Sequence, residues 1–89
     1  MLKIPHTAVM LWFEDLLPDA NGEIVIVSGG DHPQLSIVTD RKICAEGVAE
    51  RHVTAEGVDV AGLHFYTFEG GTKLYYSPDI DLTIAPAAA

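Results

Sequence analysis

The chain has 89 residues, which predicts a single domain over residues 1–89. Thirteen Asp and Glu oppose five Lys and Arg, which gives a net charge of −8, and 48% of the residues are hydrophobic. This composition excludes a disordered chain, which needs low hydrophobicity, and a protein that binds nucleic acid by neutralising phosphates, which needs a basic surface. We therefore expect a small globular domain with an acidic surface and no direct nucleic-acid binding.

The apolar stretches and the cysteine content indicate where in the cell the protein is expected to be located. The apolar run Ala8–Phe13 is six residues long and continues into Glu14 and Asp15, far short of the ~20 apolar residues that a membrane span requires. Cys44 is the single cysteine of the sequence, so no disulfide can form within the chain. These features predict a cytoplasmic protein that does not bind membranes.

The N-terminal segment allows two interpretations. We expect one short helix over residues 5–17, because Thr7 is a suitable N-cap and Pro18 would end the helix. Apolar residues at helical spacing support this helix: Val9, Trp12, Phe13 and Leu16. A strand over residues 7–13 is the alternative, since other apolar residues lie off that stripe and the run is short.

The middle of the chain predicts strands joined by turns. Residues 23–28 are rich in β-branched side chains and apolar on both faces, which is typical of a central strand. After a loop at residues 29–33, residues 35–39 are expected to return as the second strand of a hairpin. Weaker strands are predicted at residues 43–46 and 49–55, and a half-exposed strand follows at residues 79–84.

The clearest local pattern surrounds Gly70 and Gly71. Two glycines between residues 63–69 and 72–77 predict a hairpin with a two-residue turn. In that register Tyr66 lies opposite Tyr75, and side chains alternate between the two faces of the hairpin. Five side chains are then expected to share its outer face: His64, Tyr66, Phe68, Lys73 and Tyr75.

Together these elements predict an α+β, mainly β fold. Its core would be an antiparallel sheet of about five to seven strands with one short N-terminal helix. The sheet would either curl against the N-terminal segment or close toward a small barrel.

No pattern of side chains predicts catalysis. The spacing does not place Cys44 with a histidine as nucleophile and base, and the four histidines lack the separations of metal-binding motifs. The loop at Gly29 and Gly30 continues into Asp31, which would repel a phosphate. We therefore predict no catalytic residue, no metal site and no cofactor, and hence a protein that is not an enzyme.

The outer face of the hairpin is the candidate binding surface, because aromatic side chains with polar tips are enriched at recognition surfaces. The alternative is that this face is buried under the N-terminal segment. The leading hypothesis is an acidic interaction protein, of the inhibitor, immunity or anti-defence kind, that binds a basic surface of a macromolecular partner.

Two further hypotheses concern other classes of function. One is a small-molecule-binding domain or small enzyme, with a pocket lined by His64, Tyr66, Tyr75 and His32. The other is a structural homo-oligomer, such as a homodimer, that uses the hairpin face or an exposed edge strand for self-association.

Overall fold

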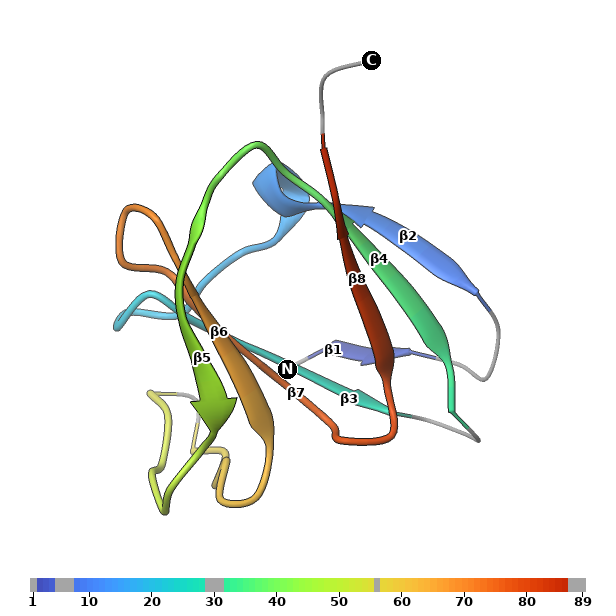
Figure 1. The fold of residues 1–89 in the computed structure, drawn as a ribbon. Helices are drawn as coiled ribbons and strands as arrows, with labels where there is room; N and C mark the ends of the chain where they lie inside the picture. Colours follow the sequence, from blue (N-terminus) through green and yellow to red (C-terminus); the bar gives the residue numbers. More distant parts are fainter. Residues whose placement is uncertain (1, 5–7, 29–31, 56, 87–89) are drawn as a thin grey trace.

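The computed structural model describes residues 2–4, 8–28, 32–55 and 57–86, which form two β-sheets (Figure 1). Its strands are β1 (Leu2–Ile4), β2 (Val9–Trp12), β3 (Glu23–Ser28), β4 (Gln34–Val38), β5 (Ile43–Val48), β6 (His64–Phe68), β7 (Lys73–Tyr76) and β8 (Asp81–Ala85). A five-stranded sheet has the order β1-β3-β7-β6-β5, and a three-stranded sheet has the order β2-β4-β8. The expected mainly β fold is confirmed.

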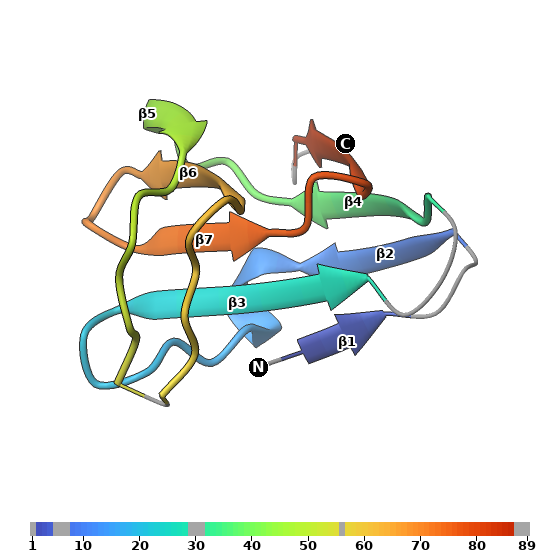
Figure 2. The same ribbon diagram turned by 90° about the horizontal axis from the view of Figure 1, so that it is seen from below.

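The chain crosses repeatedly between the two sheets. Three connections, from β1 to β2, from β3 to β4 and from β7 to β8, lead from the five-stranded to the three-stranded sheet, whereas β5, β6 and β7 follow one another within the five-stranded sheet. The three strands contributed to each sheet are parallel, and Figure 2 shows them stacked in two layers. The antiparallel pairs are β5 with β6 and β6 with β7.

This arrangement corrects two expectations. The sheets are mixed rather than purely antiparallel, and within the described residues they stay separate instead of closing into a barrel. The strand at residues 34–38 does not return beside β3 as a hairpin partner. It belongs to the other sheet and lies parallel to its neighbours β2 and β8 there.

The expected N-terminal helix is also wrong. Residues 9–12 form β2, which confirms the alternative interpretation for that part, and a single turn of 3-10 helix follows at Phe13–Asp15. In β2, Val9 and Leu11 pack against the core while Met10 and Trp12 are exposed. This two-residue alternation suits a sheet rather than a helix. Residues 5–7, where the helix was expected to begin, lie outside the described residues.

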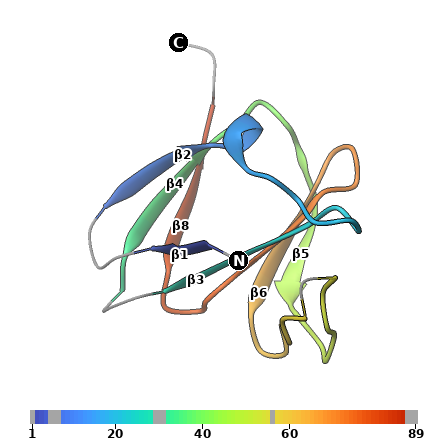
Figure 3. The ribbon, with the colours of Figure 1, turned by 180° about the vertical axis from the view of Figure 1, so that it is seen from behind.

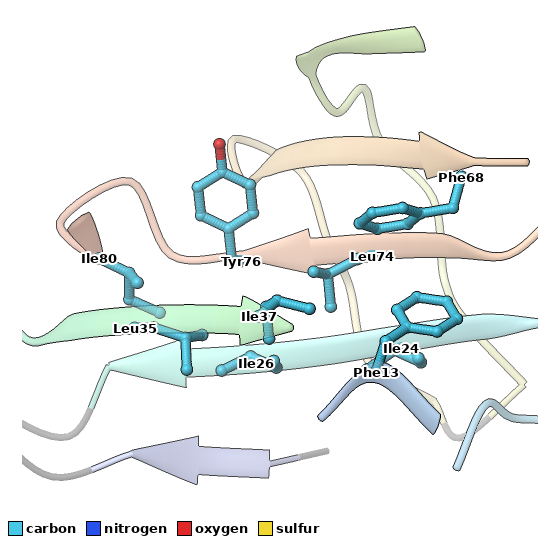
Figure 4. Close-up of a cluster of buried hydrophobic side chains, with 9 residues drawn as sticks. All are labelled: Phe13, Ile24, Ile26, Leu35, Ile37, Phe68, Leu74, Tyr76 and Ile80. Carbon is cyan, nitrogen blue, oxygen red and sulfur yellow. The ribbon is translucent and has the colours of Figure 1, made fainter. Parts of the chain in front are cut away.

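The main hydrophobic core fills the space between the sheets (Figure 4). Its buried members come from both layers and from the turn after β2: Phe13, Ile24, Ile26, Leu35, Ile37, Phe68, Leu74, Tyr76 and Ile80. Seen from behind, that turn lies between the ends of the two sheets (Figure 3). Phe13 thereby closes one end of the core.

A second, smaller core covers the other face of the five-stranded sheet. The connection from β5 to β6, residues 49–63, folds back and crosses β7 and β3 (Figure 2). Its Val60 is fully buried with Ala49 against Val25 of β3 and Tyr75 of β7. The strand expected at residues 49–55 does not form, apart from a single bridge from Val53 to Asp59.

Candidate functional site

The predicted hairpin forms, but its register differs by one residue. The backbone N–H of Phe68 donates to the carbonyl of Thr72 at 2.8 Å, so the loop contains Glu69, Gly70 and Gly71 rather than two glycines alone. Both glycines have left-handed φ values, +97° and +95°. As a result β6 and β7 pair as His64 with Tyr76, Phe65 with Tyr75, Tyr66 with Leu74, and Thr67 with Lys73.

This register separates the five residues that were expected on one face. Tyr66 and Phe68 contact the core between the sheets, whereas Tyr75 belongs to the second core on the opposite face. Phe68 and Tyr75 are only 1% and 4% exposed. The five side chains therefore do not share one outer face. The alternative, burial under the N-terminal segment, holds for Phe68, whose ring lies 4.8 Å from that of Phe13, but not for Tyr75, which packs with Ala49 and Val60.

On the core face, three aromatic rings lie together beside β5. Tyr66 stacks on Tyr76 with ring centroids 5.5 Å apart, and His64 meets Tyr76 edge-on at 5.6 Å. Burial, then the hydrogen bond with Tyr66, raises the pKa of Tyr76 well above its usual value. His64 and Tyr66 border a hollow of about 250 Å³, but Tyr75 lies on the other face of the sheet. His32 is exposed in the loop before β4, so the expected four-residue pocket is not assembled.

On the opposite face, Tyr75 takes part in a cluster that the sequence did not predict. Its hydroxyl donates to Oε2 of Glu23 at 2.9 Å, and Nε2 of His52 lies 2.9 and 3.1 Å from the two oxygens of the same carboxylate. Glu23 is 8% exposed. Burial, followed by the hydrogen bond to Glu23, raises the pKa of Tyr75 to about 12, so the hydroxyl remains a donor at neutral pH.

Asp19 supports this cluster from the turn before β3. Its Oδ1 accepts hydrogen bonds from the backbone N–H groups of Asn21 and Glu23, and its Oδ2 accepts one from Ala55. The bond from Glu23 contributes most to lowering the pKa of Asp19. The carboxylate thereby links the start of β3 to the connection that carries His52.

The outer face of the three-stranded sheet is a different kind of surface. The strand register places Trp12, Val38 and Ala85 in one row and Met10, Ser36 and Thr83 in the next. Trp12 is 47% exposed and Met10 is 65% exposed, although both are large and apolar. Within the described chain, this face therefore presents apolar and small polar side chains to solvent.

A hollow of about 420 Å³, which we call the Trp12 hollow, opens at the end of this sheet where all three strands finish. Trp12 and Val38 contribute to its apolar wall, and three acidic residues, Glu14, Asp40 and Glu69, also line it. Arg41 also lines this hollow.

The guanidinium of Arg41 is engaged on several sides. Its Nε lies 3.6 Å from Oε1 of Glu14, and Nη1 donates to the carbonyl of Glu69 at 3.1 Å. Its Cζ lies 5.2 Å from the ring centroid of Phe13. The residues that line the Trp12 hollow include one basic residue and three acidic residues, so their formal charges sum to −2.

Other candidate features contribute less. Cys44 is exposed on β5 rather than buried, and among the described residues no three His, Cys, Asp or Glu are grouped to hold a metal ion. The described part of the chain contains no helix of sufficient length and hydrophobicity to span a bilayer.

Comparison of the chain with protein families, curated proteins and solved structures finds no match. Function is therefore inferred from the residues of this chain alone.

Proposed function

We propose that this protein is a small, non-enzymatic interaction domain that binds a basic segment of a macromolecular partner in the Trp12 hollow. The observation that carries this proposal is that the half-exposed Trp12 lines one hollow together with the acidic residues Glu14, Asp40 and Glu69. An inhibitor or immunity protein that acts in the cytoplasm on a basic target would have a surface of this kind.

The chemistry of the hollow suits an Arg or Lys side chain of the partner. A guanidinium or ammonium over the face of a tryptophan gains about 0.5–2 kcal/mol, depending on how far it is desolvated. The carboxylates around it supply charge complementarity, and the net charge of −8 speeds encounter with a basic molecule. Met10, 65% exposed, extends the contact to apolar side chains beside the cation.

The test uses the fluorescence of Trp12, the single tryptophan of the sequence. A synthetic amphipathic peptide of Arg and Leu is titrated at low and high salt. We expect saturable binding that weakens with salt, because screening reduces the attraction between exposed charges. The double variant Glu14→Gln, Asp40→Asn should weaken binding at low salt.

The matched control is Asp81→Asn, which removes one carboxylate at the opposite end of the same sheet. It should bind the peptide nearly as well as the wild type, and Glu14→Gln alone provides the single-charge comparison in the hollow. Binding that is indifferent to salt, or equally weakened by Asp81→Asn and Glu14→Gln, would refute the assignment to the Trp12 hollow.

Self-association is a second candidate, favoured by the edge strand β5. All six of its residues are exposed, β6 is its one neighbour among the described strands, and Val48 is 61% exposed. An exposed edge with apolar side chains can pair with the same edge of a second copy. Sedimentation equilibrium tests this: a dimer that Val48→Lys converts to monomer supports it, and a wild-type monomer at high concentration excludes it.

A further inference from the structure

An open cleft of about 480 Å³ lies between the connection of residues 49–63 and the face of β7 that this connection covers. This volume lies in the range of small-molecule sites, about 300–1,000 Å³. The cleft lies on the opposite face of the five-stranded sheet from the main core, and its lining does not include any residue of the Trp12 hollow. Its polar side chains are Glu23, Glu50, Arg51, His52, Lys73 and Tyr75.

The wall of this cleft is held in place by a buried carboxylate. Glu23, only 8% exposed, accepts the Tyr75 hydroxyl and lies within hydrogen-bond distance of Nε2 of His52. These two contacts join β3, β7 and the connection, so they fix three walls relative to one another. Glu23 itself also lines the cleft, so its negative charge lies at the cleft wall.

In this acidic protein, the cleft lining holds as many Lys and Arg residues as Asp and Glu residues, two of each. Two of the five Lys and Arg residues of the chain, Arg51 and Lys73, line it. Nζ of Lys73 lies 5.1 Å from the ring centroid of Phe65 and 5.9 Å from that of Tyr75, which holds the ammonium group at the aromatic wall. The side chain of His52 is 45% exposed at the same opening.

We propose that this cleft binds a small aromatic monocarboxylate, with the carboxylate between Arg51 and Lys73 and the ring against the apolar wall of Phe65, Val48 and Ala49. Guanidinium and ammonium groups make the strongest hydrogen bonds to a carboxylate, and the aliphatic and aromatic wall suits a flat apolar body. The cleft has two cations and two carboxylates, Glu23 and Glu50, so a monoanion is accepted more readily than a dianion such as a phosphate.

The experiment is an NMR titration of the ¹⁵N-labelled full chain with benzoate. The backbone signals of residues 49–52 and 73–75 should change their chemical shifts at millimolar concentrations of benzoate, while the signals of β8 remain unchanged. Phenyl phosphate should bind more weakly than benzoate, and benzylamine should not bind in the cleft. Arg51→Gln and Lys73→Gln should each weaken benzoate binding about tenfold, as expected for one hydrogen bond to a charged group.

The control is Lys42→Gln, which removes a charge from an exposed residue outside the cleft and should leave benzoate affinity unchanged. Glu23→Gln should bind benzoate more tightly if it remains folded, since a negative charge near the ligand is removed; a purely structural role of Glu23 predicts no gain. The proposal is overturned if benzoate shifts none of the cleft signals, if benzylamine or phenyl phosphate binds better, or if Arg51→Gln and Lys73→Gln bind as the wild type does.

Discussion

Phe13 packs on Phe68 with ring centroids 4.8 Å apart and a tilt of 55° between the rings. Phe13 begins the turn after β2 in the three-stranded sheet, and Phe68 ends β6 in the five-stranded sheet. The contact therefore joins the two layers at one end of the core. Both rings are buried, at 6% and 1% exposure.

Truncation of this contact should destabilise the fold strongly. We expect Phe68→Ala to lower the free energy of unfolding by about 3–5 kcal/mol, because it leaves a cavity in a packed core. The control Leu17→Ala changes a side chain that is 88% exposed and should alter stability by less than about 0.5 kcal/mol. Urea denaturation measures both, and similar values for the two variants would show that the core is not packed as described.

A second prediction concerns high pH. Folding raises the pKa of Tyr75 from 10.0 to about 12, so the folded state favours the protonated hydroxyl. This pKa shift contributes up to about 3 kcal/mol to the free energy of unfolding. The contribution is complete below pH 10 and is lost as the pH rises toward 12.

The variant Tyr75→Phe isolates this effect. At neutral pH it should be less stable by about 1–3 kcal/mol, because Glu23 loses a hydrogen bond. Its stability should then fall less than that of the wild type between pH 9 and pH 11, as urea denaturation at each pH would measure. Parallel decreases in the two proteins would argue against the hydrogen bond from Tyr75 to Glu23.

The hairpin loop gives a third prediction. Gly71 has φ +95° with open space where a Cβ would lie, so Gly71→Ala should cost about 1–2 kcal/mol through backbone strain alone. Gly47→Ala is the matched control, since its Cβ would make ordinary contact with the Phe65 ring at 3.4 Å and its φ is not left-handed. Thermal unfolding compares the two; equal melting temperatures would indicate a different loop conformation.

The charge around Trp12 can be measured without any partner. Because carboxylates surround the Trp12 hollow, we expect caesium ions to quench Trp12 fluorescence more efficiently than iodide, relative to a free tryptophan amide. The double variant Glu14→Gln, Asp40→Asn should narrow this difference. Preferential quenching by iodide would mean that Arg41 dominates the field at the indole.

Local sequence pattern predicted the strands better than their partners. The run at residues 23–28 and the glycine pair at residues 70–71 were sufficient to place β3 and the hairpin. The register could not be fixed in this way, because a loop of two or three residues satisfies the same glycines. A shift of one residue in the pairing of two strands changes which side chains share a face. Tyr66 and Phe68 therefore contact the main core, whereas Tyr75 lies on the other face of the sheet.

The parallel arrangement was not accessible from the sequence. The partner of β3 is β7, and that of β4 is β8, each separated by more than forty residues. A run of β-branched residues indicates burial on both faces but not which distant strand lies alongside it. The same limit explains why the sequence did not predict that Glu23 contacts Tyr75 and His52. Glu23 and His52 lie 52 and 23 positions before Tyr75 in the chain, on different elements.

Because strands that pair with one another lie far apart in the sequence, the two sheets can form only late during synthesis of the described residues. While residues 1–70 leave the ribosome, β3 can pair only with the short β1, and β4 only with β2. Among the described strands, each layer gains its remaining parallel neighbour when β7 and β8 emerge, so neither layer is complete before residues 73–85 have been made. Nascent molecules will thus carry open strand edges until these residues emerge, and chaperone capture should be most frequent before that stage.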